Sequence, residues 1–176
     1  MKDQRSPSPS PRRSSRAKTV YLCSAAIIAA LYVALTHLSN AFGLASGVIQ
    51  CRISEALCVL PFFTPAAIPG LTVGCVIANL TTSASLVDII FGSLATLIGA
   101  VGARLLRKHK WLVTLPTILA NTLILPFVLK FILNLEESVW FFFITIFAGE
   151  LISAGIIGMI FLLSFEKLNK KNKIFK

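Results

Sequence analysis

Long apolar runs, separated by short clusters of charge, constrain this chain more than any other feature. Of its 176 residues 14% are charged, and the mean hydropathy is +0.82. A helix that crosses a bilayer needs about 20 apolar residues, because each residue adds about 1.5 Å. A water-soluble core would place polar residues at helical or strand spacing within these runs, and most of the chain lacks them. The sequence therefore predicts an all-α, polytopic membrane protein.

The basic residues gather at the ends of the apolar runs. Of the 17 Lys and Arg, six lie in residues 1–18, four in Arg104–Lys110 and five in Lys167–Lys176. Short basic stretches beside spans mark the cytoplasmic side, so the net charge of +10 does not indicate a nucleic-acid partner. Residues 1–18 and 167–176 are predicted to be basic cytoplasmic tails around a membrane domain of residues 19–166. The first tail is rich in proline and serine, and we expect it to be disordered.

The region Arg52–Leu80 decides how many spans the chain has. It is too long for one ordinary span, and it contains three prolines. Each proline removes a backbone donor and disfavours helix in the residue before it, so two short helices with a turn near Thr64–Pro65 fit best. Charge gives an independent test, because two cytoplasmic basic segments must be separated by an even number of spans.

Six spans satisfy this condition. We expect them in Thr19–Leu38, Arg52–Leu80 (two spans), Leu86–Ala103, Trp111–Leu133 and Val139–Phe165. Both termini then lie in the cytoplasm, and the protein resides in the cytoplasmic membrane.

Polar residues at membrane depth or near it form a candidate substrate-binding site. A charge at the bilayer centre costs about 2.5–3.5 kcal/mol, so such residues tend to face a cavity or a partner. Glu150 lies about 16 Å inside its span at helical rise. For Arg52 and Glu55, an internal pair three residues apart is an equally good interpretation. The predicted set is Arg52, Glu55, Asn79, Asp88, Asn121 and Glu150.

Signatures of catalysis and of metal binding are missing from the sequence. It contains no Walker A loop, nucleophile elbow, zinc-protease helix or dinucleotide fingerprint, so we expect neither an enzyme nor a bound cofactor. The four cysteines show no paired spacing and no accompanying histidines, so we expect no metal site. Energy for any transport must then come from an ion gradient or from another subunit.

One face of the first predicted span carries Ala26, Ala30 and Ala34. Side chains four residues apart share a helix face, and small residues there let another helix approach closely. This face could serve a partner subunit, and packing within the chain is the alternative.

Three segments resemble the QueT family. They are Ile49–Gly70, with the core Arg-Ile-Ser-Glu-Ala-Leu at residues 52–57, then Gly74–Asn79 and Asp88–Leu97. QueT proteins are substrate-binding S components of energy-coupling-factor (ECF) transporters, associated with the import of queuosine precursors. The resemblance covers nearly everything after residue 20. It implies a six-helix membrane protein, in agreement with the charge argument.

The resemblance also implies partners and a substrate class. Ala26, Ala30 and Ala34 match the face that docks on a transmembrane coupling subunit, and two ATPase subunits would supply the energy. The substrate would be a 7-deazaguanine such as preQ1 or preQ0, whose ring N–H and amino group one carboxylate can accept together. Two alternatives stay open: a stand-alone secondary transporter that couples to protons through Glu150, and a membrane assembly protein without a ligand.

Overall fold

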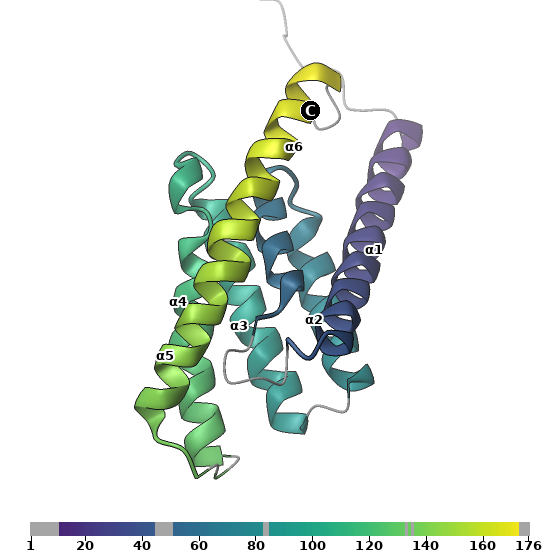
Figure 1. Cartoon of the computed structure of the whole chain (residues 1–176). Coiled ribbons are helices and arrows are strands. Elements are labelled where there is room, and N and C mark those ends of the chain that lie inside the picture. Colours follow the sequence, from purple (N-terminus) through teal and green to yellow (C-terminus); the bar gives the residue numbers. More distant parts are fainter. Residues whose placement is uncertain (1–10, 45–50, 83–84, 133, 135, 173–176) are drawn as a thin grey trace, which may run out of the picture.

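The computed structural model describes residues 11–44, 51–82, 85–132, 134 and 136–172, and all regular structure in these residues is helical (Figure 1). Two short helices, η1 and η2, are 3₁₀-helical, whereas η3 and η4 are π-helical segments that continue α4 and join α5 to α6. The order is α1 (Pro11–Ala41), η1 (Ile53–Phe62), α2 (Ala67–Thr81), α3 (Leu86–Leu105), η2 (Lys110–Leu112), α4 (Leu115–Phe127), η3 (Val128–Ile132), α5 (Val139–Glu150), η4 (Leu151–Ile157) and α6 (Gly158–Asn172).

Within the described residues the chain runs through the bundle six times, which confirms the predicted all-α membrane fold. Four helical stretches are long and apolar enough to cross a bilayer: Ser15–Ala41, Leu86–Leu105, Lys110–Ile132 and Val139–Lys170. The other two passes are the shorter apolar helices η1 and α2. They form the hairpin that the prolines predicted, because η1 ends at Phe62 and α2 begins at Ala67. The start of α1 and the end of α6 lie at the same end of the bundle (Figure 1).

The first helix begins earlier than the sequence predicted. We expected residues 1–18 to be disordered and the helix to start at Thr19, but α1 starts at Pro11. Proline is favoured at the first position of a helix, and the arginines that follow it are good helix formers. The side chains from Ser15 to Lys18 are exposed, so this extension needs no apolar partner. Residues 1–10 lie outside the described residues, and the tail boundaries at 18 and 167 stay predictions.

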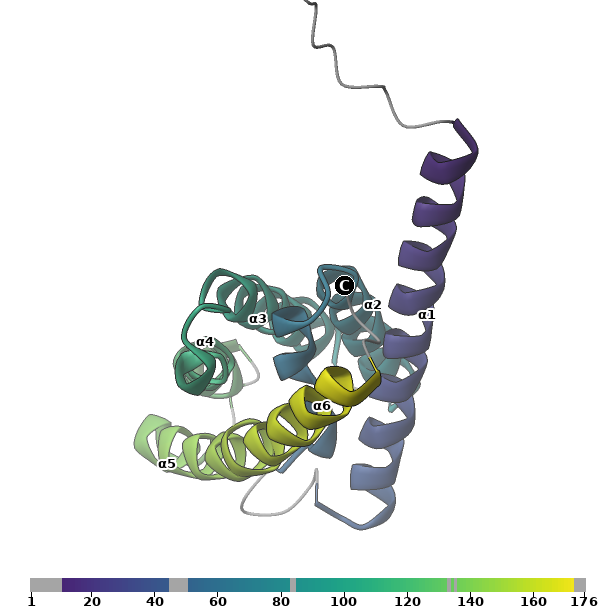
Figure 2. The ribbon, with the colours of Figure 1, turned by 90° about the horizontal axis from the view of Figure 1, so that it is seen from above.

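Small residues bring neighbouring helices into close contact. A Cβ atom added to Gly70 of α2 would lie 2.7 Å from the carbonyl oxygen of Ala25 in α1. One added to Gly74 would lie 2.9 Å from the Cβ atom of Tyr32. Van der Waals packing drives helix association in lipid, so these glycines fix how closely α1 and α2 approach. Viewed from above, the first half of α1 extends beyond the bundle, and its second half lies against α2 (Figure 2).

The 3₁₀ helix η1 occupies the centre of the bundle, in contact with α1, α3, η4 and α6. Its residues from Ser54 to Pro61 are all buried. Pro61 lacks a backbone donor, and 3₁₀ geometry leaves free carbonyl groups at the C-terminal end. Arg104 of α3 satisfies two of them, because its Nη1 donates to the carbonyl oxygens of Pro61 at 3.0 Å and Phe62 at 3.3 Å.

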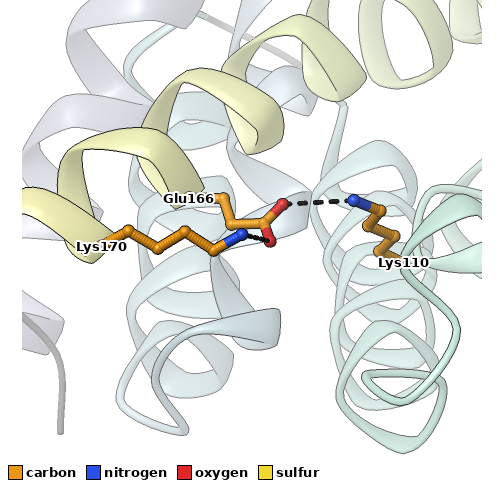
Figure 3. Close-up of polar contacts among 3 residues, drawn as sticks. All are labelled: Lys110, Glu166 and Lys170. Atoms are coloured by element: carbon orange, nitrogen blue, oxygen red, sulfur yellow. Dashed lines mark hydrogen bonds and ion pairs between the residues drawn. The ribbon is translucent and has the colours of Figure 1, made fainter.

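An ion-paired group lies near the end of α6. Glu166 accepts from Lys170, one turn along the same helix, at 3.1 Å and from Lys110 of η2 at 3.5 Å (Figure 3). We call these three residues the lysine clasp. It links α6 to the connection between α3 and α4.

Candidate functional site

The start of η1 presents Glu55 to the interior of the bundle. Glu55 is 2% exposed, and each of its carboxylate oxygens accepts a hydrogen bond. Tyr32 Oη of α1 donates to Oε1, and Cys58 Sγ of η1 donates to Oε2 at 3.1 Å. The carboxylate is therefore held in one orientation by groups from two helices. Neither Tyr32 nor Cys58 was among the predicted site residues.

Glu150 lies where α5 gives way to the π-helical turn of η4. π-helical turns within α-helices are frequently found at functional sites. Glu150 is 6% exposed, and its Oε1 accepts from Asn121 Nδ2 of α4 at 2.7 Å. Its Oε2 is buried and has no hydrogen-bond partner among the described residues. A buried carboxylate oxygen without a partner is costly, so this atom is a ready acceptor for a ligand donor.

Arg52 precedes η1 and reaches across to α2. Its Nη1 donates to Asn79 Oδ1 at 3.3 Å, and Asn79 Nδ2 donates to the backbone oxygen of Asp88 at 3.4 Å. Among the described residues Arg52 and Glu55 form no ion pair, so the internal pair considered from the sequence is not what the structure contains. Asn79 therefore holds the Arg52 guanidinium in place by accepting its hydrogen bond.

The Asp88 side chain has a local role in this structure. Its Oδ2 accepts from Ser85 Oγ at 2.9 Å, and its backbone N–H donates to the same hydroxyl at 3.1 Å. This reciprocal arrangement caps the N-terminus of α3. Asp88 is not among the residues that line the cavity described next.

Four of the six predicted substrate residues line one cavity. We call Arg52, Glu55, Asn121 and Glu150 the carboxylate cluster. They come from the residue before η1, from η1, from α4 and from the end of α5. The remaining lining residues are Gly92, Thr96, Leu125 and Ile146. The volume open to the centre of a water molecule is about 20 Å³. That space suits about one water, so a larger ligand must move the lining side chains apart.

The four lining residues missing from the prediction follow a simple spacing. Leu125 lies four residues after Asn121, and Ile146 lies four residues before Glu150. Gly92 and Thr96 lie four and eight residues after Asp88. Residues four apart share a helix face, so the residues four positions from Asn121, Glu150 and Asp88 could have been predicted to line the same cavity.

The alanine face predicted for docking is exposed. Ala26, Ala30 and Ala34 are exposed on α1, whereas Ala29 of the same helix is 8% exposed and faces α2. A shallow apolar groove runs along this face between α1 and α2, with Val73 and Ile77 on its far side. Packing within the described residues therefore leaves the three alanine side chains exposed.

Comparison with known proteins identifies the family. The model of the QueT transporter family matches residues 22–167. The chain belongs to the QueT transporter family. One relative, named queuosine precursor transporter QueT, from Lactococcus lactis subsp. cremoris (strain MG1363), is 41% identical over 83 residues. That match spans 47% of this chain and 48% of the relative, so the chain matches about half of the relative's length. No solved structure matches the chain.

The family assignment confirms the resemblance inferred from the sequence motifs. The matched residues 22–167 contain the whole carboxylate cluster and the alanine face. The match to this family and the helices long and apolar enough to cross a bilayer together identify the chain as a multi-pass membrane protein.

Proposed function

We propose that this chain is the solute-binding S component of an ECF importer and that its solute is a queuosine precursor of the 7-deazaguanine class. Two findings support the proposal: membership of the QueT transporter family and the similarity to a relative named as a queuosine precursor transporter. The chemistry of the carboxylate cluster agrees with a base of this kind.

The observation that carries the proposal is the free oxygen of Glu150. A 7-deazaguanine offers a ring N–H and an exocyclic amino group side by side, and one carboxylate can accept from both. Glu150 Oε2 is buried without a partner among the described residues, while Oε1 is held by Asn121. Binding would give Oε2 its missing donor. It would also exclude bases that present acceptors at the same edge.

Arg52 and Glu55 would complete the recognition from the opposite helix. The guanidinium of Arg52 lines the cavity and would donate to the ring carbonyl, as Arg does to guanine in nucleic acids. Glu55 would face a cationic aminomethyl group on the seven position of the ring. Asn79 acts indirectly in this arrangement, because its Oδ1 already accepts from Arg52.

The alanine face gives the proposed partner a place to bind. Ala26, Ala30 and Ala34 would contact a transmembrane coupling subunit, and two ATPase subunits bound to it would drive import. Small exposed side chains in a bilayer allow a partner helix to approach closely. The basic segments at residues 1–18, Arg104–Lys110 and 167–176 would place both termini in the cytoplasm, with the carboxylate cluster nearer the outer side.

Calorimetric titration of the purified protein in detergent tests the proposal. We expect tight binding of preQ1 or preQ0 and no comparable heat from guanine or thiamine. Guanine is a demanding control, because it shares the ring N–H and amino edge and differs at the seven position. Absence of binding by either precursor would remove the substrate assignment and leave the fold and the family intact.

A second function is favoured by the same carboxyl group. A buried Glu150 with a free oxygen could also carry a proton, as acidic residues within membrane helices do in secondary transporters. Two sets of proteoliposomes separate the two functions, one that contains this chain alone and one that also contains the coupling and ATPase subunits. Uptake of preQ1 that needs a proton gradient and no ATPase would favour the secondary transporter, whereas uptake that needs the ATPase subunits would support the S component.

A further inference from the structure

Three hydroxyl groups on one face of α1 bind the start of η1. Tyr32, Thr36 and Ser39 are spaced by four and three residues, so they share a helix face, and they are 1%, 3% and 0% exposed. Tyr32 Oη donates to Glu55 Oε1, Thr36 Oγ1 donates to Ser54 Oγ at 2.9 Å, and Ser39 Oγ accepts from Ile53 N–H at 2.9 Å. Consecutive residues of η1 thus meet successive turns of α1.

The three contacts are not equivalent. Thr36 Oγ1 also reaches the backbone oxygen of Tyr32 at 2.9 Å, and Ser39 Oγ donates to that of Leu35 at 2.9 Å. These two hydroxyls therefore have partners within their own helix if η1 moves. The phenol of Tyr32 lies beyond the reach of its own backbone, and its hydrogen-bond acceptor is Glu55. Only the Tyr32 contact ends on a residue of the carboxylate cluster.

Packing holds the Tyr32 ring in place. The ring is buried beside α2 at the glycine contact, since a Cβ atom at Gly74 would come within 2.9 Å of the Cβ of Tyr32. Tyr32 belongs to the same core cluster as Leu57 and Leu71. A fixed donor of this kind fixes its acceptor, because in a low-dielectric interior a hydrogen bond to a carboxylate is strong and directional.

We propose that Tyr32 is a positioning residue for the ligand site. It orients the Glu55 carboxylate toward the cavity without itself lining it, so α1 sets ligand affinity through this one hydrogen bond. The proposal rests on the proposed function for its ligand, but not for the contact between Tyr32 and Glu55. Thr36 and Ser39 hold α1 to η1 and leave the orientation of the carboxylate unchanged.

Calorimetry with preQ1 on four proteins tests the proposal: wild type, Tyr32→Phe, Glu55→Gln and the double variant. The chain offers a matched control in Tyr21→Phe, because Tyr21 is exposed on the same helix. We expect Tyr32→Phe to raise Kd about tenfold, since a hydrogen bond to a charged group is worth about that much. Tyr21→Phe should leave Kd unchanged. The double variant should bind no more weakly than Glu55→Gln, because both changes remove the same oriented carboxylate.

Two outcomes of the Tyr32→Phe titrations would overturn the proposal. One is a wild-type Kd in Tyr32→Phe, and the other is a double variant whose loss is the product of the two single losses. Thr36→Val and Ser39→Ala separate positioning from general support of the helix contact. We expect each to change Kd less than threefold. A loss as large as that of Tyr32→Phe would show that α1 acts only by holding η1 in place.

A measurement without ligand distinguishes failure of this proposal from failure of the proposed function. Infrared spectra of protein labelled with ¹³C-glutamate, with Glu55→Gln as reference, isolate the carboxyl band of Glu55. Tyr32→Phe should shift that band, and Tyr21→Phe should not. If wild type binds no deazaguanine but the band shifts, the positioning contact stands and the substrate is wrong. An unshifted band would contradict the positioning role whatever the ligand. The infrared measurement can also be made if Tyr32→Phe is too unstable for titration.

Discussion

Two carboxyl groups of the sixth pass, Glu150 and Glu166, have opposite surroundings. The Glu166 side chain is 25% exposed, and each of its oxygens has a lysine partner in the lysine clasp. Glu150 is 6% exposed, and one of its oxygens has no partner among the described residues. Both oxygens of Glu166 are therefore paired at a site that water can reach, whereas Glu150 is buried and its Oε2 can still accept a hydrogen bond. The difference separates a group that supports the fold from one that is available to a ligand.

The largest expected effect falls on ligand binding at Glu150. Glu150→Gln keeps a hydrogen-bonding side chain for Asn121 but removes the paired acceptor, so Kd for preQ1 should rise about 100-fold, which corresponds to about 2.7 kcal/mol. Calorimetry in detergent measures it. Glu166→Gln serves as the matched control and should bind as wild type does. Equal losses in the two variants would break the comparison between these carboxyl groups.

Helix packing should show the next largest effect. Gly70→Val places side-chain atoms against the backbone oxygen of Ala25, which cannot move without shifting α1. We expect the free energy of unfolding to fall by about 2 kcal/mol, as for other overpacked sites. Thermal denaturation in detergent measures the loss. Gly155→Ala is the control, because the nearest atoms to its new Cβ are side-chain carbons at 3.4 and 3.6 Å, and it should change little.

Removal of the guanidinium that caps η1 should cost less. Arg104→Gln leaves the carbonyls of Pro61 and Phe62 without their charged donor, which should lower the free energy of unfolding by about 1–2 kcal/mol. Arg107→Gln, on an exposed neighbour, should be neutral. A neutral result for Arg104→Gln would show that the end of η1 is open to water and needs no internal donor.

The smallest effect should come from the lysine clasp. Lys110→Ala breaks one ion pair between partly exposed groups, and such pairs are worth about 0–1 kcal/mol. The small loss should shrink further as salt concentration rises, because salt screens exposed charges. Thermal denaturation at two salt concentrations measures it. A loss of stability as large as that of Arg104→Gln, and equal at both salt concentrations, would show that water does not reach the charges of the lysine clasp.

Much of the fold could be predicted from the sequence because a bilayer allows few solutions. The alternation of apolar runs and basic clusters gave six passes, and the prolines between Arg52 and Leu80 gave the hairpin. The start of α1 at Pro11 was not predicted, because a segment rich in proline and serine with few apolar residues carries no helical pattern. The 3₁₀ geometry of η1 and the π-helical turn after Glu150 have no clear sequence signal, since tertiary packing selects them.

The candidate site was predicted in part, and depth was the useful signal. Arg52, Glu55, Asn121 and Glu150 are polar residues near or within apolar runs, and the structure brings them to one cavity. Asp88 shares that pattern, yet Ser85 engages its side chain at the helix end, which depth alone does not reveal. Tyr32 was missed because a tyrosine in an apolar helix looks like an ordinary core residue until its partner is known. Whether these residues bind the substrate stays a prediction.

The close contact of α1 with α2 has a consequence for how related sequences can diverge. Cβ atoms added to Gly70 and Gly74 would meet backbone and Cβ atoms of α1, so helix packing and not the bound solute limits the size of these residues. Gly92, in contrast, lines the cavity, and a Cβ atom added there would lie 3.2 Å from the side-chain amide nitrogen of Asn79, which can move more easily than backbone. If the cavity binds the solute, we expect related proteins with a different solute to vary at position 92 together with 121 and 150. We expect positions 70 and 74 to stay small in related sequences whatever solute they bind, because a larger side chain there would separate α1 from α2.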